Sequence, residues 1–150
     1  DTYIEGYETL GPEPLSAGFN AEYLTPLAQK SRKAIKTFIL DQHIIAGLGN
    51  IYADECLALA GILPMRAANS LSSEELVRLC EAVNAVIAQG IKNHGTTFRD
   101  YRDGEGNKGD NQNHLLVYSR AGQPCKKCGR TLVQMKIGGR GSVYCENCQK

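Results

Sequence analysis

The chain has 150 residues, enough for one domain of ordinary size together with a small module, and 42% of them are hydrophobic. No apolar stretch is long enough to predict a membrane span, and the net charge of +1 does not by itself indicate a nucleic-acid-binding protein. The distribution of charge is more informative, because no Lys or Arg precedes Lys30 and basic residues then cluster at 30–36 and 126–140. This asymmetry favours one anion-binding face.

The first forty residues predict an extended segment followed by two short helices. Glycines and prolines recur through residues 1–19, which favours an extended opening segment. Apolar residues at helical spacing predict helices at 21–29 and 33–40. Arg32 and Lys36 are four residues apart, so we expect them to share one helix face. That face is either an anion-binding surface or an ordinary solvated basic surface.

A glycine turn then leads into a third helix. Gly47 and Gly49 precede Asn50, whose side chain can cap a helix predicted at 51–60 and ended by Gly61. Free backbone N–H groups and the helix dipole would make this N-terminus a phosphate site. A capped helix after a tight turn, with no ligand, is the alternative.

The middle of the chain contains one long helix and one long loop. Residues 72–75 (Ser-Ser-Glu-Glu) form a capping-box pattern, and the apolar stripe that follows predicts a core helix ending near His94 and Gly95. Residues 95–114 are polar and glycine-rich without an apolar period, which is typical of a functional or disordered loop. Residues 115–118 are expected to form a short strand leading to the C-terminal module.

The C-terminal module contains two Cys-x-x-Cys pairs separated by sixteen residues. This spacing is typical of a four-thiolate zinc site, and nearby Lys and Arg side chains would favour the thiolate form. Two disulfides are the alternative, but no secretory signal opens the chain, so a reducing, cytoplasmic environment is expected. The predicted ligands of one Zn²⁺ are Cys125, Cys128, Cys145 and Cys148.

Between the cysteine pairs, residues 131–137 and 142–144 predict two strands joined by a turn at 138–141. Arg140 would then be a lone cation at a glycine-rich tip, either solvated or aimed at a polyanion. The fold expected is mainly α with a small β zinc finger. We expect a helical domain at 1–118 and a zinc hairpin at 119–150.

Four runs together resemble bacterial formamidopyrimidine-DNA glycosylase, and the resemblance covers essentially the whole chain. They are residues 10–15 (Leu-Gly-Pro-Glu-Pro-Leu), 46–55 (Ala-Gly-Leu-Gly-Asn-Ile-Tyr-Ala-Asp-Glu), 95–101 (Gly-Thr-Thr-Phe-Arg-Asp-Tyr) and 139–149 (Gly-Arg-Gly-Ser-Val-Tyr-Cys-Glu-Asn-Cys-Gln). The second run resembles the family's helix–two-turns–helix motif, and the last resembles its zinc finger.

The resemblance implies base-excision repair of oxidised purines, with 8-oxoguanine and formamidopyrimidines removed from duplex DNA and the abasic strand then cut by β- and δ-elimination. By this likeness Asn50 and the amides near Gly47 and Gly49 would hold a phosphate beside the lesion, and Arg32 and Lys36 would contact the DNA backbone. Arg140 would enter the minor groove and act in δ-elimination, where charge stabilisation of the departing phosphate suits a guanidinium better than proton donation. The expected lesion-loop residues are Gly109, Asp110, Asn111 and Gln112.

The family's nucleophile is an amino-terminal proline in a separate catalytic domain, and nothing like it opens this sequence. We therefore expect these 150 residues to be part of a longer protein, to bind zinc and DNA as a monomer away from any membrane, and not to catalyse alone. Two other functions remain open: an endonuclease VIII-like enzyme for oxidised pyrimidines, and a non-catalytic zinc module.

Overall fold

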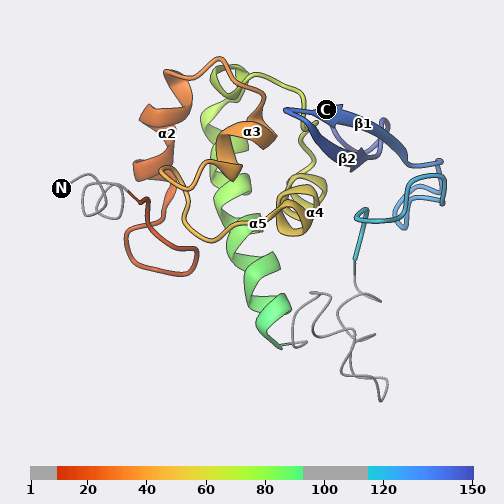
Figure 1. Cartoon of the computed structure of the whole chain (residues 1–150), viewed down its shortest axis with the longest axis horizontal. Helices are drawn as coiled ribbons and strands as arrows, with labels where there is room; N and C mark the ends of the chain where they lie inside the picture. Colours follow the sequence, from red (N-terminus) through yellow and green to blue (C-terminus); the bar gives the residue numbers. More distant parts are fainter. Residues whose placement is uncertain (1–9, 93–114) are drawn as a thin grey trace.

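The computed structural model describes residues 10–92 and 115–150 as a helical body that carries a small antiparallel hairpin (Figure 1). This confirms the expected class, mainly α with a small β zinc finger. The helices and strands in chain order are α2 (Ala21–Gln29), α3 (Ile35–Leu40), α4 (Asn50–Ala60), the 3-10 helix η1 (Ala68–Ser70), α5 (Ser73–Lys92), β1 (Val133–Ile137) and β2 (Arg140–Tyr144).

Local sequence signals set several helix ends. Asn20 caps α2, because its Oδ1 accepts a hydrogen bond from the Tyr23 N–H at 2.8 Å. The capping box of α5 is confirmed, with the Ser72 N–H donating to Glu75 at 2.8 Å and the Glu75 N–H donating to Ser72 Oγ at 3.1 Å. Gly61 ends α4 at a φ of 77°, a left-handed conformation that glycine adopts without steric cost.

Two helix starts differ from the sequence-based expectation. The second helix begins at Ile35 rather than residue 33, because Ala34 has a non-helical ψ of 141° and forms an isolated β-bridge with Ala67. The cap of α4 is Gly49, and Asn50 is the first helical residue, so the expectation that Asn50 caps this helix is wrong. Gly49 has no side chain, so the cap residue makes no side-chain hydrogen bond to the first turn of α4.

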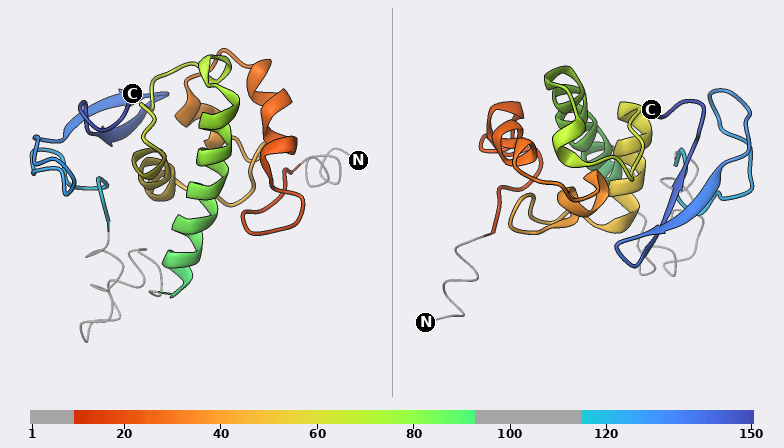
Figure 2. Two further views of the ribbon diagram at one scale, coloured as in Figure 1. Left: turned by 180° about the vertical axis from the view of Figure 1, so that it is seen from behind. Right: turned by 90° about the horizontal axis from the view of Figure 1, so that it is seen from above.

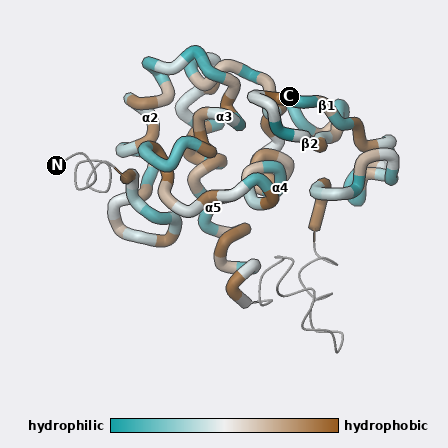
Figure 3. Tube along the Cα trace, in the orientation of Figure 1, coloured by the Kyte–Doolittle hydropathy of each residue, from teal (hydrophilic) through white to brown (hydrophobic). Residues whose placement is uncertain are grey.

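Helix α5 forms the centre of the body, with α2 on one side and α4 on the other (Figures 1 and 2). Brown, hydrophobic positions recur along the helices between hydrophilic ones (Figure 3), as expected where one helix face is buried. The core contains fully buried side chains from each of these helices, including Leu24, Ile39, Leu57 and Leu79. Among residues 10–92 and 115–150, no helix combines the length and apolarity needed to cross a lipid bilayer.

The hairpin has a two-residue loop, shorter than expected from the sequence. Ile137 pairs with Arg140, and Gly138 and Gly139 form the turn with φ values of 60° and 82°. Positive φ at both loop positions gives the twist that two-residue hairpins need, and only glycine takes it freely. Arg140 is therefore the first residue of β2 and not the tip of the turn, which corrects the expected strand start at residue 142.

The hairpin lies beside α4, on the side of the body away from α2 (Figures 1 and 2). A second hydrophobic cluster joins the two, because Ala58 of α4 packs with Leu132 and Val143 of the module. The expected strand at 115–118 is absent: these residues form a bend and a turn. The reason is that their N–H groups donate to a side chain of α4 and not to a neighbouring strand.

Candidate metal centre and nucleic-acid interface

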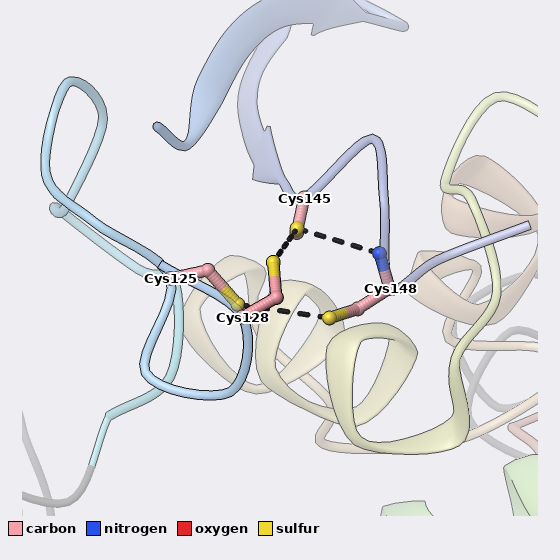
Figure 4. A group of neighbouring side chains, drawn as sticks. All are labelled: Cys125, Cys128, Cys145 and Cys148. Atoms are coloured by element: carbon pink, nitrogen blue, oxygen red, sulfur yellow. Dashed lines mark hydrogen bonds between the residues drawn. The ribbon is translucent and has the colours of Figure 1, made fainter. Parts of the chain in front are cut away.

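Four cysteine sulfurs meet at the base of the hairpin. Cys125 and Cys128 lie on one turn and Cys145 and Cys148 on another, and the four side chains point toward one another (Figure 4). All four Sγ atoms lie within 4.8 Å of one another. The spacing in sequence therefore becomes one cluster in space.

The distances between sulfurs fit one tetrahedral zinc ion. Cys125 Sγ lies 3.8 Å from Cys148 Sγ, and Cys128 Sγ lies 3.6 Å from Cys145 Sγ. Zinc–sulfur bonds of about 2.3 Å in a tetrahedron place sulfurs about 3.8 Å apart, whereas a disulfide bond is about 2.05 Å long. All four cysteines are free. The cluster matches a Cys₄ zinc site and not a pair of disulfides.

Backbone N–H groups lower the pKa of two of the four thiols, those of Cys125 and Cys128. The pKa of Cys128 falls to about 6, mainly because the Arg130 N–H donates to its sulfur. Burial opposes ionisation of Cys125, but the N–H groups of Cys128 and Lys127 lower its pKa overall. Burial and the neighbouring thiols raise the pKa of Cys148 to about 12. A dication would remove this conflict, because it stabilises all four thiolates together.

The N-terminus of α4 faces the hairpin. Asn50 Nδ2 lies 3.4 Å from the Gly141 carbonyl oxygen, so Asn50 contacts the residue that follows Arg140. Asn50 Oδ1 is buried and accepts no hydrogen bond within the described part of the chain. An uncapped helix N-terminus and an exposed arginine are thus brought together from positions 90 residues apart in sequence.

The glycine turn before α4 is partly occupied by the protein itself. Gly47 has a φ of 83°, and its N–H donates to Gln42 Oε1 at 2.7 Å. This N–H is therefore engaged in the structure, which corrects the expectation of a free amide at Gly47. Gly49 is exposed and extended at the cap position. Gln42, which holds the turn, carried no signal in the sequence.

Lys36 is not on an exposed helix face. Its side chain has an exposed fraction of 0%, and its ammonium lies 2.8 Å from Asp54 Oδ1. Arg32 is exposed and precedes α3, so the two cations do not share a face as expected from their spacing. Arg32 borders a hollow between α2 and α3 with Lys30 and Lys33. The burial of Lys36 leaves no surface for direct contact with a phosphate.

A second hollow, of about 380 Å³, opens between the α4 N-terminus, residues 118–121 and the hairpin. Asn50, Tyr118, Gln134 and Gly141 contribute to its lining. Tyr118 and Gln134 were not identified from the sequence, because neither belongs to a motif with a recognisable spacing. The expected lesion-loop residues 109–112 lie outside the described residues.

Two consecutive carboxylates on α4, Asp54 and Glu55, were also missed. Glu55 accepts hydrogen bonds from three successive N–H groups, those of Leu116, Val117 and Tyr118, at 2.6–2.8 Å. Asp54 accepts one from the Val143 N–H at 3.2 Å, and burial raises its pKa against the opposing effect of Lys36. These contacts fix the segment that leads into the zinc module, and strand β2 within the module, to one helix.

Two family models match the chain. Residues 10–102 match the formamidopyrimidine-DNA glycosylase H2TH domain, and residues 122–150 match a zinc finger found in FPG and IleRS. The zinc-finger match covers all four clustered cysteines and Arg140.

Curated relatives agree over nearly the whole chain. The chain is 51% identical over 140 residues to a formamidopyrimidine-DNA glycosylase of Desulfitobacterium hafniense, covering 93% of this chain and 51% of that protein. It is 49% identical over 148 residues to that of Desulforamulus reducens, covering 99% and 53%. The chain thus spans about half the length of the curated relatives it matches.

Solved structures agree as well. A complex of Lactococcus lactis Fpg with DNA containing an abasic site superposes with a TM-score of 0.88 at 35% identity, covering 99% of this chain and 55% of that one. A complex of the same protein with DNA containing FAPY-dG gives 0.87 at 34%, covering 99% and 54%. Sequence motifs, fold and cysteine geometry therefore converge: the chain belongs to the formamidopyrimidine-DNA glycosylase family, of which it contains the H2TH domain and the zinc finger.

Proposed function

We propose that this chain is the DNA-binding part of a bifunctional base-excision repair glycosylase and AP lyase that removes oxidised purines from duplex DNA. The observation that carries the proposal is the contact between Asn50 and Gly141, which sets the uncapped N-terminus of α4 beside Arg140. In this proposal the helix dipole, the Asn50 amide and the Arg140 guanidinium bind the same phosphate backbone. The relatives' names and the DNA in the similar solved structures support the same assignment.

Each proposed contact has a distinct role. Asn50 Nδ2 has a second hydrogen that can donate to a phosphate while the first faces Gly141. Backbone groups near Gly49 add to the positive end of α4. Arg140 is exposed, and its guanidinium would stabilise charge on the phosphate that departs in δ-elimination. Clamps of this kind would offset the few kcal/mol that extrusion of the damaged base requires.

The remaining predicted site residues complete the proposal. Arg32, exposed before α3, would contact the backbone away from the lesion. Gly47 would set the shape of the turn before α4, because its own N–H is engaged by Gln42. The loop at 95–114, with residues 109–112 at the extruded base, would provide lesion contacts. Zinc held by the four cysteines would keep β2 and Arg140 in place.

The proposal separates binding from chemistry. Residues 1–150 alone would bind zinc and DNA without cutting the strand, because the resemblance implies a nucleophile in a separate catalytic domain and this chain spans about half of its relatives' length. We place the domain boundary at residue 118, with the helical domain at 1–118 and the zinc hairpin at 119–150. The protein would act as a monomer on the bacterial chromosome in the cytoplasm.

A binding assay with a stable abasic-site duplex tests the proposal. Arg140→Ala should weaken binding about tenfold, which corresponds to about 1.4 kcal/mol. It should also lower the slope of log affinity against log salt by about 0.9, since one phosphate contact is lost. Lys136→Ala is the matched control, because Lys136 is an exposed cation of the same hairpin that lies on β1. Equal affinity of the Arg140→Ala variant and the unaltered protein would refute the proposed site.

Lesion profiling of the protein as encoded by its gene tests the substrate class. Duplexes with 8-oxoguanine or a formamidopyrimidine should be cut faster than duplexes with an oxidised pyrimidine. Preference for the oxidised pyrimidine would assign an endonuclease VIII-like activity, and no cutting of any lesion would leave a non-catalytic DNA-binding module.

A further inference from the structure

The Lys36 side chain extends from α3 to the hairpin, and its ammonium contacts Asp54 of α4 and two residues of β2. Its Nζ lies 2.8 Å from Asp54 Oδ1, 2.9 Å from the Gly141 carbonyl oxygen and 2.6 Å from Ser142 Oγ. The ammonium therefore donates hydrogen bonds to Gly141 and Ser142. With Asp54 it forms an ion pair, although Asp54 Oδ1 accepts no well-aligned hydrogen bond within the described part of the chain. The side chain is fully buried and has no surface from which to contact DNA.

Asp54 extends this network to the next residue of β2. Its side chain is 1% exposed, and its Oδ2 accepts the Val143 N–H at 3.2 Å. Lys36 and Asp54 therefore hold three consecutive residues of β2, Gly141 to Val143, from two different helices. The residue directly before this held segment is Arg140.

Stability alone does not account for a buried ion pair at this place. Removing two charges from water costs several kcal/mol per ion, and apolar residues of similar volume often stabilise a fold as well or better. Hydrogen-bonded charges differ from apolar packing because they are directional, so they fix the position and register of strand β2 relative to the two helices. The Gly141 carbonyl oxygen shows the consequence, because it receives both the Lys36 ammonium at 2.9 Å and Asn50 Nδ2 at 3.4 Å.

We infer that Lys36, paired with Asp54, is a positioning residue that sets where Arg140 stands relative to Asn50. It does so through the Gly141 carbonyl and Ser142, without contacting DNA. The inference rests on the proposed function, since it assumes that Asn50 and Arg140 grip one backbone. It also gives the buried lysine a role other than the phosphate contact expected from the sequence.

A double-mutant cycle on the protein as encoded, loaded with zinc, tests the inference. Lys36→Met with Asp54→Asn removes both charges, keeps the side-chain volumes and leaves an oxygen for the Val143 N–H. Arg140→Ala is then made in the unaltered and in the altered background, and affinity for an abasic-site duplex is measured well below the unfolding temperature. We expect about a tenfold loss in the unaltered background and less than about twofold in the altered one.

A second ion pair supplies the matched control. Arg66 Nη1 lies 2.6 Å from Glu75 Oε2, and within the described part of the chain neither side chain forms a hydrogen bond with a hairpin residue between Val133 and Tyr144. With Arg66→Met and Glu75→Gln, Arg140→Ala should still cost its full tenfold. If the loss shrinks there too, general loosening explains the effect and the inference is overturned.

Zinc content and the unfolding transition are measured for every variant. Should the double substitution fail to fold, Lys36→Arg replaces it, because a planar guanidinium keeps the charge but cannot reproduce the same two hydrogen bonds and ion pair. The same loss of coupling supports the inference. An unchanged tenfold effect of Arg140→Ala in an altered background that is folded and zinc-loaded overturns it. No effect of Arg140→Ala in the unaltered protein would instead refute the proposed function, and the inference with it.

Discussion

Replacing Glu55 with glutamine should weaken the attachment of the zinc module to α4. The Glu55 carboxylate is 4% exposed and accepts the Leu116 N–H on one oxygen and the Val117 and Tyr118 N–H groups on the other. A glutamine has one acceptor oxygen, and its NH₂ group would face a backbone donor at 2.6–2.8 Å. At least one buried N–H therefore loses its partner.

The magnitude follows from these three bonds. An unsatisfied buried N–H costs about 1–3 kcal/mol, and the two bonds that remain become neutral and weaken by about half. A neutral amide is less costly to bury than a carboxylate, which offsets part of this loss of stability. We expect Glu55→Gln to lower the free energy of unfolding by about 2–3 kcal/mol.

Urea unfolding in excess zinc measures this change. With a denaturant slope of about 2 kcal/mol per molar, the midpoint should fall by about 1–1.5 M. Amide hydrogen exchange supplies a local readout, because the protection of the Leu116, Val117 and Tyr118 amides should fall most. Glu81→Gln, on an exposed position of α5, is the control and should change stability by less than about 0.5 kcal/mol. A Glu55→Gln midpoint equal to that of the control would refute the reasoning.

Three further outcomes are expected. Cys145→Ser should release the zinc ion and unfold the hairpin, and retention of one zinc per chain by atomic absorption would contradict the four-thiolate site. Gly139→Ala should lower the free energy of unfolding by about 1 kcal/mol, because φ at this position is 82° and only glycine adopts it freely. Unchanged stability in thermal unfolding would contradict the requirement for glycine in the turn. Arg66 holds the pKa of Glu75 below its usual value, so this pair stabilises the fold above about pH 4.3 and ceases to do so as pH falls through the lowered pKa. Glu75→Gln should therefore cost about 0.5–1 kcal/mol at pH 7 and nothing near pH 2, and a pH-independent difference would contradict the ion pair.

Hydrogen bonds outside the metal cluster hold the zinc module to the helical body. Gln149 is 2% exposed and bridges the two parts: its Oε1 accepts the Cys145 N–H at 2.8 Å, and its Nε2 donates to the Ile62 carbonyl at 2.8 Å. The Lys150 N–H donates to the Gly61 carbonyl at 2.9 Å. Zinc loss should therefore disturb the hairpin while these contacts at the end of α4 oppose full detachment.

Features encoded by short-range chemistry could be predicted from the sequence. The spacing of the cysteines places two sulfurs on each of two turns, so one metal site follows from local geometry. The capping box at Ser72 and Glu75 and the left-handed Gly61 likewise depend only on neighbouring residues. The resemblance to the glycosylase family came from such local runs and is confirmed.

Long-range contacts decided the rest. Spacing predicted Lys36 on an exposed face, but the hairpin residues that bury it lie more than 100 residues away in sequence. Asn50 has the side chain of a cap, yet Gly49 takes that position and Asn50 turns to Gly141. Residues 115–118 were expected to form a strand, but Glu55 accepts the N–H groups of residues 116–118. Sequence alone determined the metal site and the helices, because their interactions are local. Only the tertiary structure decided which polar groups stay exposed and which hold the two parts together, because burial depends on partners that no short pattern contains.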